Sequence, residues 1–133
     1  MIKLIREWLD LVSSGPAERW PTFAADDVVI RLPFAPPGVA SELRGRAHAI
    51  EALGDLWKAK KSFAWHDVVI RRTDDPGLFV TTARSEAVLM SGQHYANDYV
   101  ILTRLRDGKV VEHVEYFNPL PVIEVFLRQP AAL

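Results

Sequence analysis

The chain has 133 residues, which suits one domain large enough to bury a core. Its residues are 49% hydrophobic and 25% charged, as in ordinary globular proteins, and 16 basic against 17 acidic residues leave a net charge of -1. A nucleic-acid partner is disfavoured because it would need a basic surface, and the absence of cysteine excludes disulfides, thiolate metal sites and cysteine nucleophiles.

Residues 2 to 12 have apolar side chains at helical spacing with charges between them, which predicts an amphipathic first helix. This stretch has no small-residue cleavage site and is untypical of a signal peptide. No apolar run approaches the roughly 20 residues that a membrane span needs. We therefore expect a cytoplasmic protein without membrane contact.

The middle of the chain alternates turn signals with periodic segments. Residues 13 to 16 (SSGP) end the first helix, and Pro16 suits the first turn of a short second helix that runs to about Trp20. A strand is predicted over 27 to 32, where β-branched residues are frequent, and a proline-rich loop follows it. A second amphipathic pattern predicts a helix over 46 to 60.

The second half of the chain is β-rich. Strands are predicted over residues 63 to 72, 78 to 90, 95 to 106 and 109 to 117, and Asp107-Gly108 is the strongest hairpin signal. The short links predict an antiparallel meander, and residues 120 to 127 are either a terminal helix or an extended tail. These elements make residues 1 to 133 a single α+β domain with a pocket between the helices and a bent sheet. Apolar residues on both sheet faces predict a homodimer.

Strand alternation divides the stretch EHVEYF, residues 112 to 117. His113, Glu115 and Phe117 share one face, whereas Glu112 and Tyr116 share the other. If the first face lines a dry pocket, Glu115 is a candidate general acid or base. The alternative is a solvated carboxylate on a half-exposed strand.

By the same alternation, His66 shares a face with Val68 and Ile70. A histidine there can carry a proton or orient a carboxylate, or it can be an ordinary hydrogen-bonded histidine of the core. The four histidines are scattered at positions 48, 66, 94 and 113 without a metal-binding spacing, so no metal site is supported.

Further candidates are polar or aromatic residues elsewhere in the chain. Asn97 and Tyr99 share a strand face and could stabilise a developing oxyanion, or simply cap and pack the strand. Trp20, Phe34 and Trp57 could line a cavity for a ring compound, although a role in the core needs no special account.

Three segments together resemble a known family: WHDVVIRRTDDP (65 to 76), YANDYV (95 to 100) and DGKVVEHVEYFNP (107 to 119). They are similar to the SnoaL-like branch of the nuclear transport factor 2-like (NTF2-like, ketosteroid isomerase-like) superfamily, and look closest to the phenazine biosynthesis A/B type proteins. The resemblance implies a cone-shaped α+β barrel with a central pocket, a homodimer, and catalysis without metal or organic cofactor.

Site residues are also implied by this resemblance. Its motifs put Glu115 in the pocket as the acid/base and His66 beside it, while Asn118 stands where many SnoaL-like sequences have aspartate. The remaining substrate-binding residues are then expected to be Tyr99, Asn97, His113, Asn118, Trp20, Phe34 and Trp57.

Three functions remain open at this point. The leading hypothesis is a cofactor-independent acid/base enzyme, of isomerase, cyclase or dehydratase type, acting on a small cyclic or polyketide-like or phenazine-like substrate. The alternatives are a non-catalytic module that binds a small apolar ligand, and a dimeric scaffold whose pocket is filled by side chains. The same fold can serve each of these.

Overall fold

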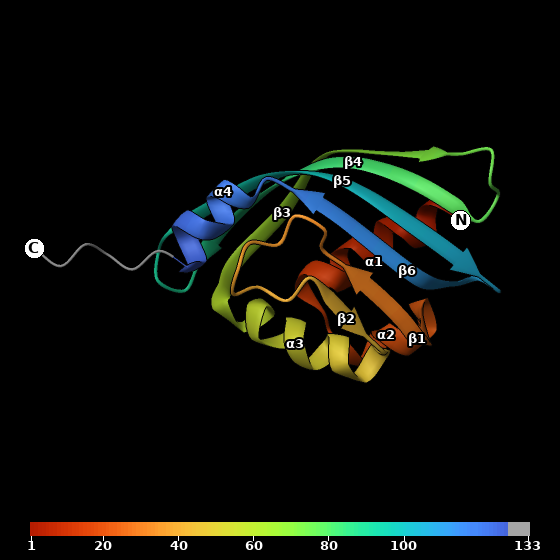
Figure 1. Ribbon diagram of the computed structural model, residues 1–133, viewed down its shortest axis with the longest axis horizontal. Coiled ribbons are helices and arrows are strands. Elements are labelled where there is room, and N and C mark those ends of the chain that lie inside the picture. Colours follow the sequence, from red (N-terminus) through yellow and green to blue (C-terminus); the bar gives the residue numbers. More distant parts are fainter. Residues whose placement is uncertain (128–133) are drawn as a thin grey trace, which may run out of the picture.

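A curled six-stranded sheet wraps around helices in this protein, whose computed structural model describes residues 1–127 (Figure 1). The strand order is β2-β1-β6-β5-β4-β3. The strands are β1 Ala24–Arg31, β2 Glu42–Arg44, β3 Lys60–Arg72, β4 Leu78–Leu89, β5 His94–Arg106 and β6 Lys109–Phe117. The α+β prediction is confirmed.

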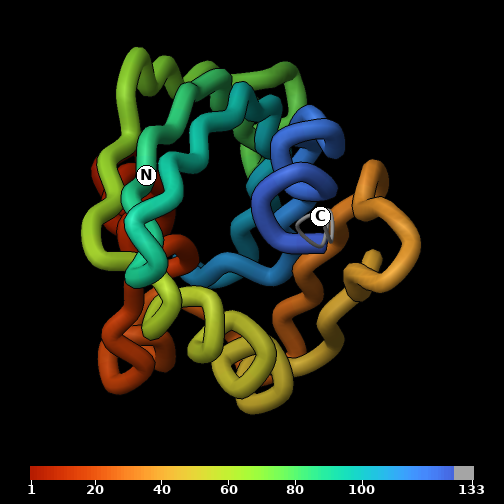
Figure 2. The backbone as a smooth tube through the Cα atoms, turned by 90° about the vertical axis from the view of Figure 1, so that its left-hand side faces the viewer, coloured from red at the N-terminus to blue at the C-terminus, as the bar shows by residue number. Residues whose placement is uncertain are grey.

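The helices lie mainly at the start of the chain. They are α1 Ile2–Ser14, α2 Trp20–Phe23 after the 3-10 turn Ala17–Arg19, α3 Arg46–Ala59, and α4 Pro119–Val122, which continues as the π-helix Ile123–Leu127 (η2). Viewed along the long axis, the strands follow one another around a ring that α3 helps to close (Figure 2). No helix in residues 1–127 is both long and apolar enough to cross a membrane.

Strands β3 to β6 form the predicted antiparallel meander. The β5–β6 turn uses Asp107 and Gly108, both with positive φ, as the hairpin signal requires. Two features were not predicted. β1 pairs in parallel with β6, with Ile30 opposite His113, and the three-residue strand β2 extends the sheet beyond β1.

The amphipathic face of α1 supplies much of the core. Its buried side chains include Ile5, Trp8, Leu11 and Val12, which belong to one cluster with the β1 side chain Val28. Trp8 meets Trp20 edge-on, with ring centroids 4.7 Å apart. Burying two indole rings of this size anchors α1 and α2 against the same part of the sheet.

A β-bulge in β3 changes the predicted side-chain directions. The register with β4 shifts between His66 and Val69, and Asp67 has φ 53°. Because the bulge inserts an extra residue, the strict two-residue alternation fails. Val68 and Ile70 still face inwards, but His66 and Asp67 are both exposed. The prediction that His66 shares a face with Val68 and Ile70 is therefore wrong.

Gly15 ends α1 with φ 71°, a conformation that only glycine adopts readily with the accompanying extended ψ. A Cβ atom there would lie 3.0 Å from Cε3 of Trp57, a residue of α3. The glycine thus permits close contact between the end of α1 and α3.

We predict that Gly15→Ala lowers the free energy of unfolding by about 1 to 2 kcal/mol, through backbone strain and the clash with Trp57. Gly54→Ala is the matched control. Gly54 lies inside α3 with open space around its Cβ position, so alanine should raise stability by about 0.5 to 1 kcal/mol. Urea denaturation of both variants measures the two changes, and an unaltered midpoint for Gly15→Ala would contradict the prediction.

Candidate functional site

A cavity of about 520 Å³ lies between α3, the concave face of the sheet and the segment formed by α4 and η2. Most of its wall is apolar, with contributions from every one of these elements. The ionisable or hydroxyl-bearing side chains in the wall are Ser13, Lys60, Tyr95, Tyr99, His113 and Glu115. A largely apolar cavity with a few convergent polar groups is typical of small-molecule sites.

Glu115 and His113 form the polar centre of the wall. They project to the same side of β6, and Nε2 of His113 lies 3.0 Å from Oε1 of Glu115. The His113 side chain is 0% exposed, and that of Glu115 is 19% exposed. The carboxylate therefore reaches the cavity while its histidine partner is fully enclosed.

Trp8 determines which nitrogen of His113 carries the proton. The indole Nε1 of Trp8 donates a hydrogen bond of 3.0 Å to Nδ1 of His113. Because an indole N–H can only donate, Nδ1 must be unprotonated, and the neutral ring carries its hydrogen on Nε2. His113 then donates to Glu115, so a chain of two hydrogen bonds runs from α1 through the last strand to the cavity.

Two tyrosines on β5 bring hydroxyl groups to the same cavity. The Tyr99 hydroxyl lies 2.9 Å from Oγ of Ser85, and that of Tyr95 accepts a hydrogen bond from Nδ2 of Asn97. Burial raises the pKa of Tyr99 well above its usual value, and the nearby Tyr95 and Glu115 add to the shift. Burial also raises the pKa of Tyr95. Both hydroxyls consequently keep their protons at neutral pH and can donate hydrogen bonds.

Lys60 lies in the wall at the junction of α3 and β3. Burial lowers the pKa of its ammonium group to about 8, while the negative charge of Glu115 acts in the opposite direction. The nitrogen donates to the backbone oxygen of Ser13 and lies 4.4 Å from the ring centroid of Phe63.

Aromatic walls are fixed to the last turns of α1 by hydrogen bonds. Nε1 of Trp57 donates to the carbonyl oxygen of Val12, and Nε1 of Trp65 approaches both the carbonyl oxygen of Leu9 and Oγ of Ser13. Trp65 also packs edge-on against Tyr99, with centroids 5.0 Å apart. Since each indole N–H has a partner, these rings present apolar surface to the cavity without a buried unpaired donor.

Among the residues expected in the site, Glu115, His113, Tyr99 and Trp57 line the cavity. His66 does not. Its side chain is 46% exposed on the convex face, and its Nε2 lies 3.5 Å from Oε2 of Glu86. The prediction that His66 accompanies Glu115 in the pocket is wrong because of the bulge at Asp67, and His113 is the histidine that contacts the carboxylate.

Four other expected residues lie outside the cavity wall. Trp20 is 0% exposed in the core and donates to the carbonyl oxygen of Leu11, whereas Phe34 is exposed. Asn97 is buried, and its amide joins β5 to the backbone of Asn118. Asn118 itself is exposed and accepts a hydrogen bond from the backbone N–H of Leu120 at the start of α4. Trp20 therefore has the core role that the sequence left open, and the cavity wall gives no support to a substrate-binding role for the other three.

Three residues of the site escaped the sequence analysis. Tyr95 belongs to the quoted segment YANDYV and shares the strand face of Asn97 and Tyr99, so alternation could have identified it. Lys60 carries no such signal, because it lies where a helix becomes a strand. Trp8 fits the apolar face of α1, and nothing in its spacing indicates a contact with His113.

The curled sheet, the enclosed helices and the lateral cavity define a protein of NTF2-like fold. A crystal structure of an NTF2-like protein from Burkholderia xenovorans matches with a TM-score of 0.74 at 16% identity, covering 92% of each chain. One of a phenazine biosynthesis-related protein from Pseudomonas aeruginosa matches with a TM-score of 0.75 at 18% identity, covering 98% of this chain and 86% of that chain. At such identities the likeness establishes the fold.

The chain belongs to the SnoaL-like domain family, whose model matches residues 5–113. A relative from Pseudomonas aeruginosa, described as an uncharacterized PhzA/B-like protein, is 31% identical over 117 residues, which cover 87% of this chain and 82% of the relative. The family resemblance predicted from the three sequence segments is thereby confirmed.

The hydrogen-bond chain can be tested through Trp8. We predict that nitrogen-15 NMR of the native protein at neutral pH shows an unprotonated Nδ1 and a protonated Nε2 in His113. Trp8→Phe keeps an aromatic ring but leaves Nδ1 without its donor, and should lower the free energy of unfolding by about 1 to 3 kcal/mol. A hydrogen on Nδ1 of the native ring would contradict the geometry.

Proposed function

We propose that this protein is an acid/base enzyme that moves a proton on a small cyclic or polyketide-like substrate, with Glu115 as the group that takes and returns the proton. The supporting observation is the carboxylate at the cavity wall, held through Oε1 by a buried histidine whose tautomer is fixed by Trp8. Such an oriented carboxylate in a largely apolar cavity has the placement that general acid/base chemistry requires.

The proposed reaction uses the chain's own side chains. With Oε1 of Glu115 accepting from His113, Oε2 is the oxygen that takes a proton from a carbon next to a carbonyl group and returns it at a second position. The carbonyl oxygen gains negative charge as the proton leaves. The protonated hydroxyls of Tyr95 and Tyr99 are donors suited to stabilising that charge. His113 positions the carboxylate and is not consumed.

The size and chemistry of the cavity favour a ring compound. A volume of about 520 Å³ accommodates one or two fused rings, and the walls contributed by Trp57, Trp65 and Phe63 offer apolar contacts. A cavity of this size argues against the scaffold alternative, in which side chains fill the pocket. The binding-module alternative differs from the enzyme in one respect, since it needs no proton transfer at Glu115.

An enolisable bicyclic ketone provides a direct test, because proton transfer appears as deuterium exchange without knowledge of the natural product. We predict that the native protein accelerates exchange of the α-protons of 2-tetralone in deuterated buffer, followed by proton NMR. Glu115→Gln removes the basic oxygen and should slow this exchange by about 10² to 10⁴-fold. Its melting temperature should change little, since the amide oxygen of glutamine can still accept from His113.

His66→Gln is the matched control for the exchange measurement. Because His66 lies on the convex face, this variant should exchange 2-tetralone at the native rate. Equal exchange rates for the native protein and Glu115→Gln would refute the role of Glu115. Binding of the ketone with no catalysed exchange in the native protein would favour the binding module.

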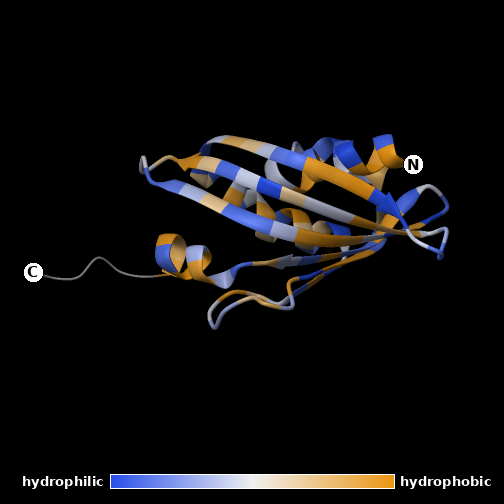
Figure 3. Cartoon of the chain, turned by 90° about the horizontal axis from the view of Figure 1, so that it is seen from above, coloured by the Kyte–Doolittle hydropathy of each residue, from blue (hydrophilic) through white to orange (hydrophobic). Residues whose placement is uncertain are grey.

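We further propose that two copies associate through the convex face of the sheet. A row of side chains crosses this face from Val69 through Thr82 and Val100 to Tyr116, on which Phe34 packs edge-on. Val69, Val100 and Phe34 are among the exposed large hydrophobic residues. Figure 3 shows hydrophobic and hydrophilic residues mixed along the strands of the sheet. The adjacent row on one side is also apolar and consists of Val80, Leu102 and Val114. Arg84 and Asp98 lie on the other side, so a partner would cover an apolar area with a charged border.

We predict that Val100→Glu converts a native dimer into a monomer in sedimentation velocity, because it buries a charge in the middle of the row. Leu120→Glu places the same charge on α4, away from the convex face, and should leave the dimer intact. A native protein that sediments as a monomer at micromolar concentration would contradict the proposed association.

A further inference from the structure

Lys60 is a charged group in an otherwise apolar part of the cavity wall. Its neighbours in the wall include Phe63 and Trp57, and its nitrogen lies over the Phe63 ring at 4.4 Å from the centroid. The backbone oxygen of Ser13 accepts one of its hydrogens. An ammonium group has three N–H donors, so a carbonyl oxygen and an aromatic face leave donor capacity for a further group.

The charge of Lys60 has no close counter-ion within residues 1–127. Glu115 is the carboxylate that acts on it electrostatically, but no contact joins the two groups, and Oε1 of Glu115 accepts its hydrogen bond from His113. A buried cation without a contact anion is unfavourable, and burial lowers its pKa to about 8 for this reason. An anionic oxygen brought by a ligand would restore a charge-assisted hydrogen bond in a largely apolar site.

We propose that Lys60 is an anion-binding subsite, and that the ligands of this cavity are ring compounds carrying an acidic oxygen, either a carboxylate or an ionised phenol or enol. This inference rests on the proposed function only in placing ligand and proton transfer in the same cavity. In this arrangement the acidic oxygen binds at Lys60 and the ring fills the apolar space of the cavity that Glu115 also lines. Lys60 thereby sets which carbon of the ligand meets the carboxylate, which makes it a specificity-determining residue.

Anion binding at Lys60 is coupled to the protonation of its amine, and this coupling can be measured. In the free protein the ammonium of Lys60 loses its proton around pH 8, and a bound anion stabilises the protonated form. Binding near pH 8 must therefore take up protons, and affinity must fall as the pH rises above 8. The other titratable groups in the wall are Glu115, His113, Tyr95 and Tyr99, and the two tyrosines keep their protons in this range.

Isothermal titration calorimetry with 2-naphthoate and its neutral counterpart 2-naphthamide tests the subsite without any turnover. The native protein should bind 2-naphthoate about ten- to a hundredfold more tightly than 2-naphthamide at about pH 7. At pH 8, titrations in two buffers of different ionisation enthalpy should show proton uptake for 2-naphthoate and none for 2-naphthamide. Lys60→Arg keeps its charge between about pH 8 and about pH 10, so 2-naphthol titrated against this variant over that range distinguishes a phenolate from a carboxylate preference.

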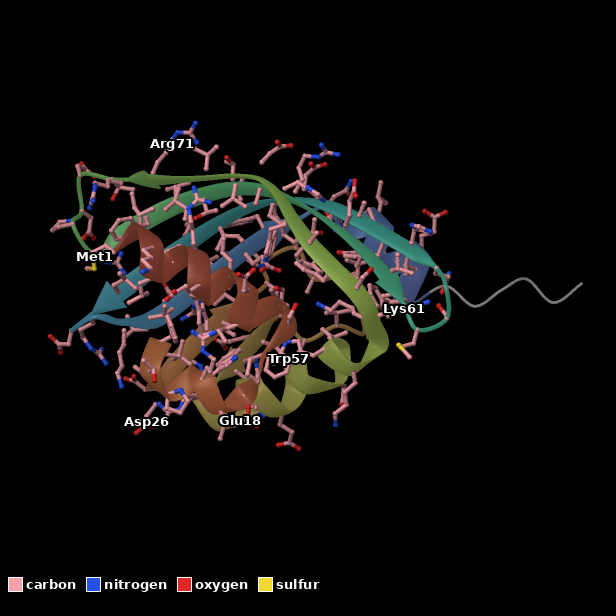
Figure 4. All side chains as sticks on the ribbon, turned by 180° about the vertical axis from the view of Figure 1, so that it is seen from behind. Met1, Glu18, Asp26, Trp57, Lys61 and Arg71 are labelled. Carbon is pink, nitrogen blue, oxygen red and sulfur yellow. The ribbon has the colours of Figure 1, made fainter. Side chains whose placement is uncertain are left out.

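Lys60→Met should abolish the preference for 2-naphthoate and the proton uptake while retaining binding of 2-naphthamide. Lys61→Met is the matched control, because the neighbouring Lys61 is exposed and outside the cavity wall (Figure 4). Lys60→Arg retains a charge at high pH, so it should keep 2-naphthoate binding above pH 8, where the native protein loses it. Lys60→Arg still tests the anion-binding subsite if Lys60→Met fails to fold.

Equal affinity of the native protein for 2-naphthoate and 2-naphthamide would overturn the subsite, as would the same loss of 2-naphthoate binding in Lys61→Met. These outcomes are independent of the 2-tetralone measurement. If Lys60 binds no anion but Glu115→Gln abolishes exchange, the acid/base function stands alone. If exchange is unaffected while the naphthoate preference depends on Lys60, the cavity is an anion-binding site without that chemistry.

Discussion

The hydrogen bond from Trp8 to His113 is the contact on which the site depends. It joins residues 105 positions apart in the sequence, one on the first helix and one on the last strand. Both side chains are fully buried, so the bond forms only when α1 is seated against the completed sheet. Because it fixes the tautomer of His113, it also fixes the donor that holds Glu115. Folding and site assembly are therefore the same event here.

The sequence predicts those features of the site that depend on local patterns, and fails for those that depend on contacts between distant residues. Alternation placed His113 and Glu115 correctly because their stretch of β6 is regular, and the Asp107-Gly108 signal positioned the preceding turn. The same rule failed for His66, since no residue type marks the one-residue bulge at Asp67 clearly enough to be foreseen. The parallel pairing of β1 with β6 was also missed, because it joins the two ends of the chain and leaves no local pattern.

The cavity wall places polar groups among apolar side chains, and burying a polar group there is unfavourable unless it has a hydrogen-bond partner. Its polar groups are satisfied mainly by other side chains and by the backbone of α1, which accepts hydrogen bonds from both Trp57 and Trp65. Glu115, the hydroxyls of Tyr95 and Tyr99, and Lys60 are then the groups that can form further hydrogen bonds with a ligand. Sequence could identify the carboxylate and, by strand alternation, both Tyr95 and Tyr99. It could not identify Lys60, whose chemistry comes from three-dimensional burial alone.

The segment formed by α4 and η2 contributes to the shape of the cavity without taking part in the hydrogen bonds that hold the carboxylate of Glu115. Val122, Phe126 and Leu127 contribute to the wall, and Phe126 packs edge-on against Tyr95 with centroids 5.2 Å apart. None of these three side chains belongs to the chain of contacts that holds Glu115. Substitutions within this short stretch can therefore reshape the cavity while leaving the carboxylate and its supports unchanged. The ligand preference of this cavity can thus be altered through a few consecutive residues that take no part in holding the carboxylate.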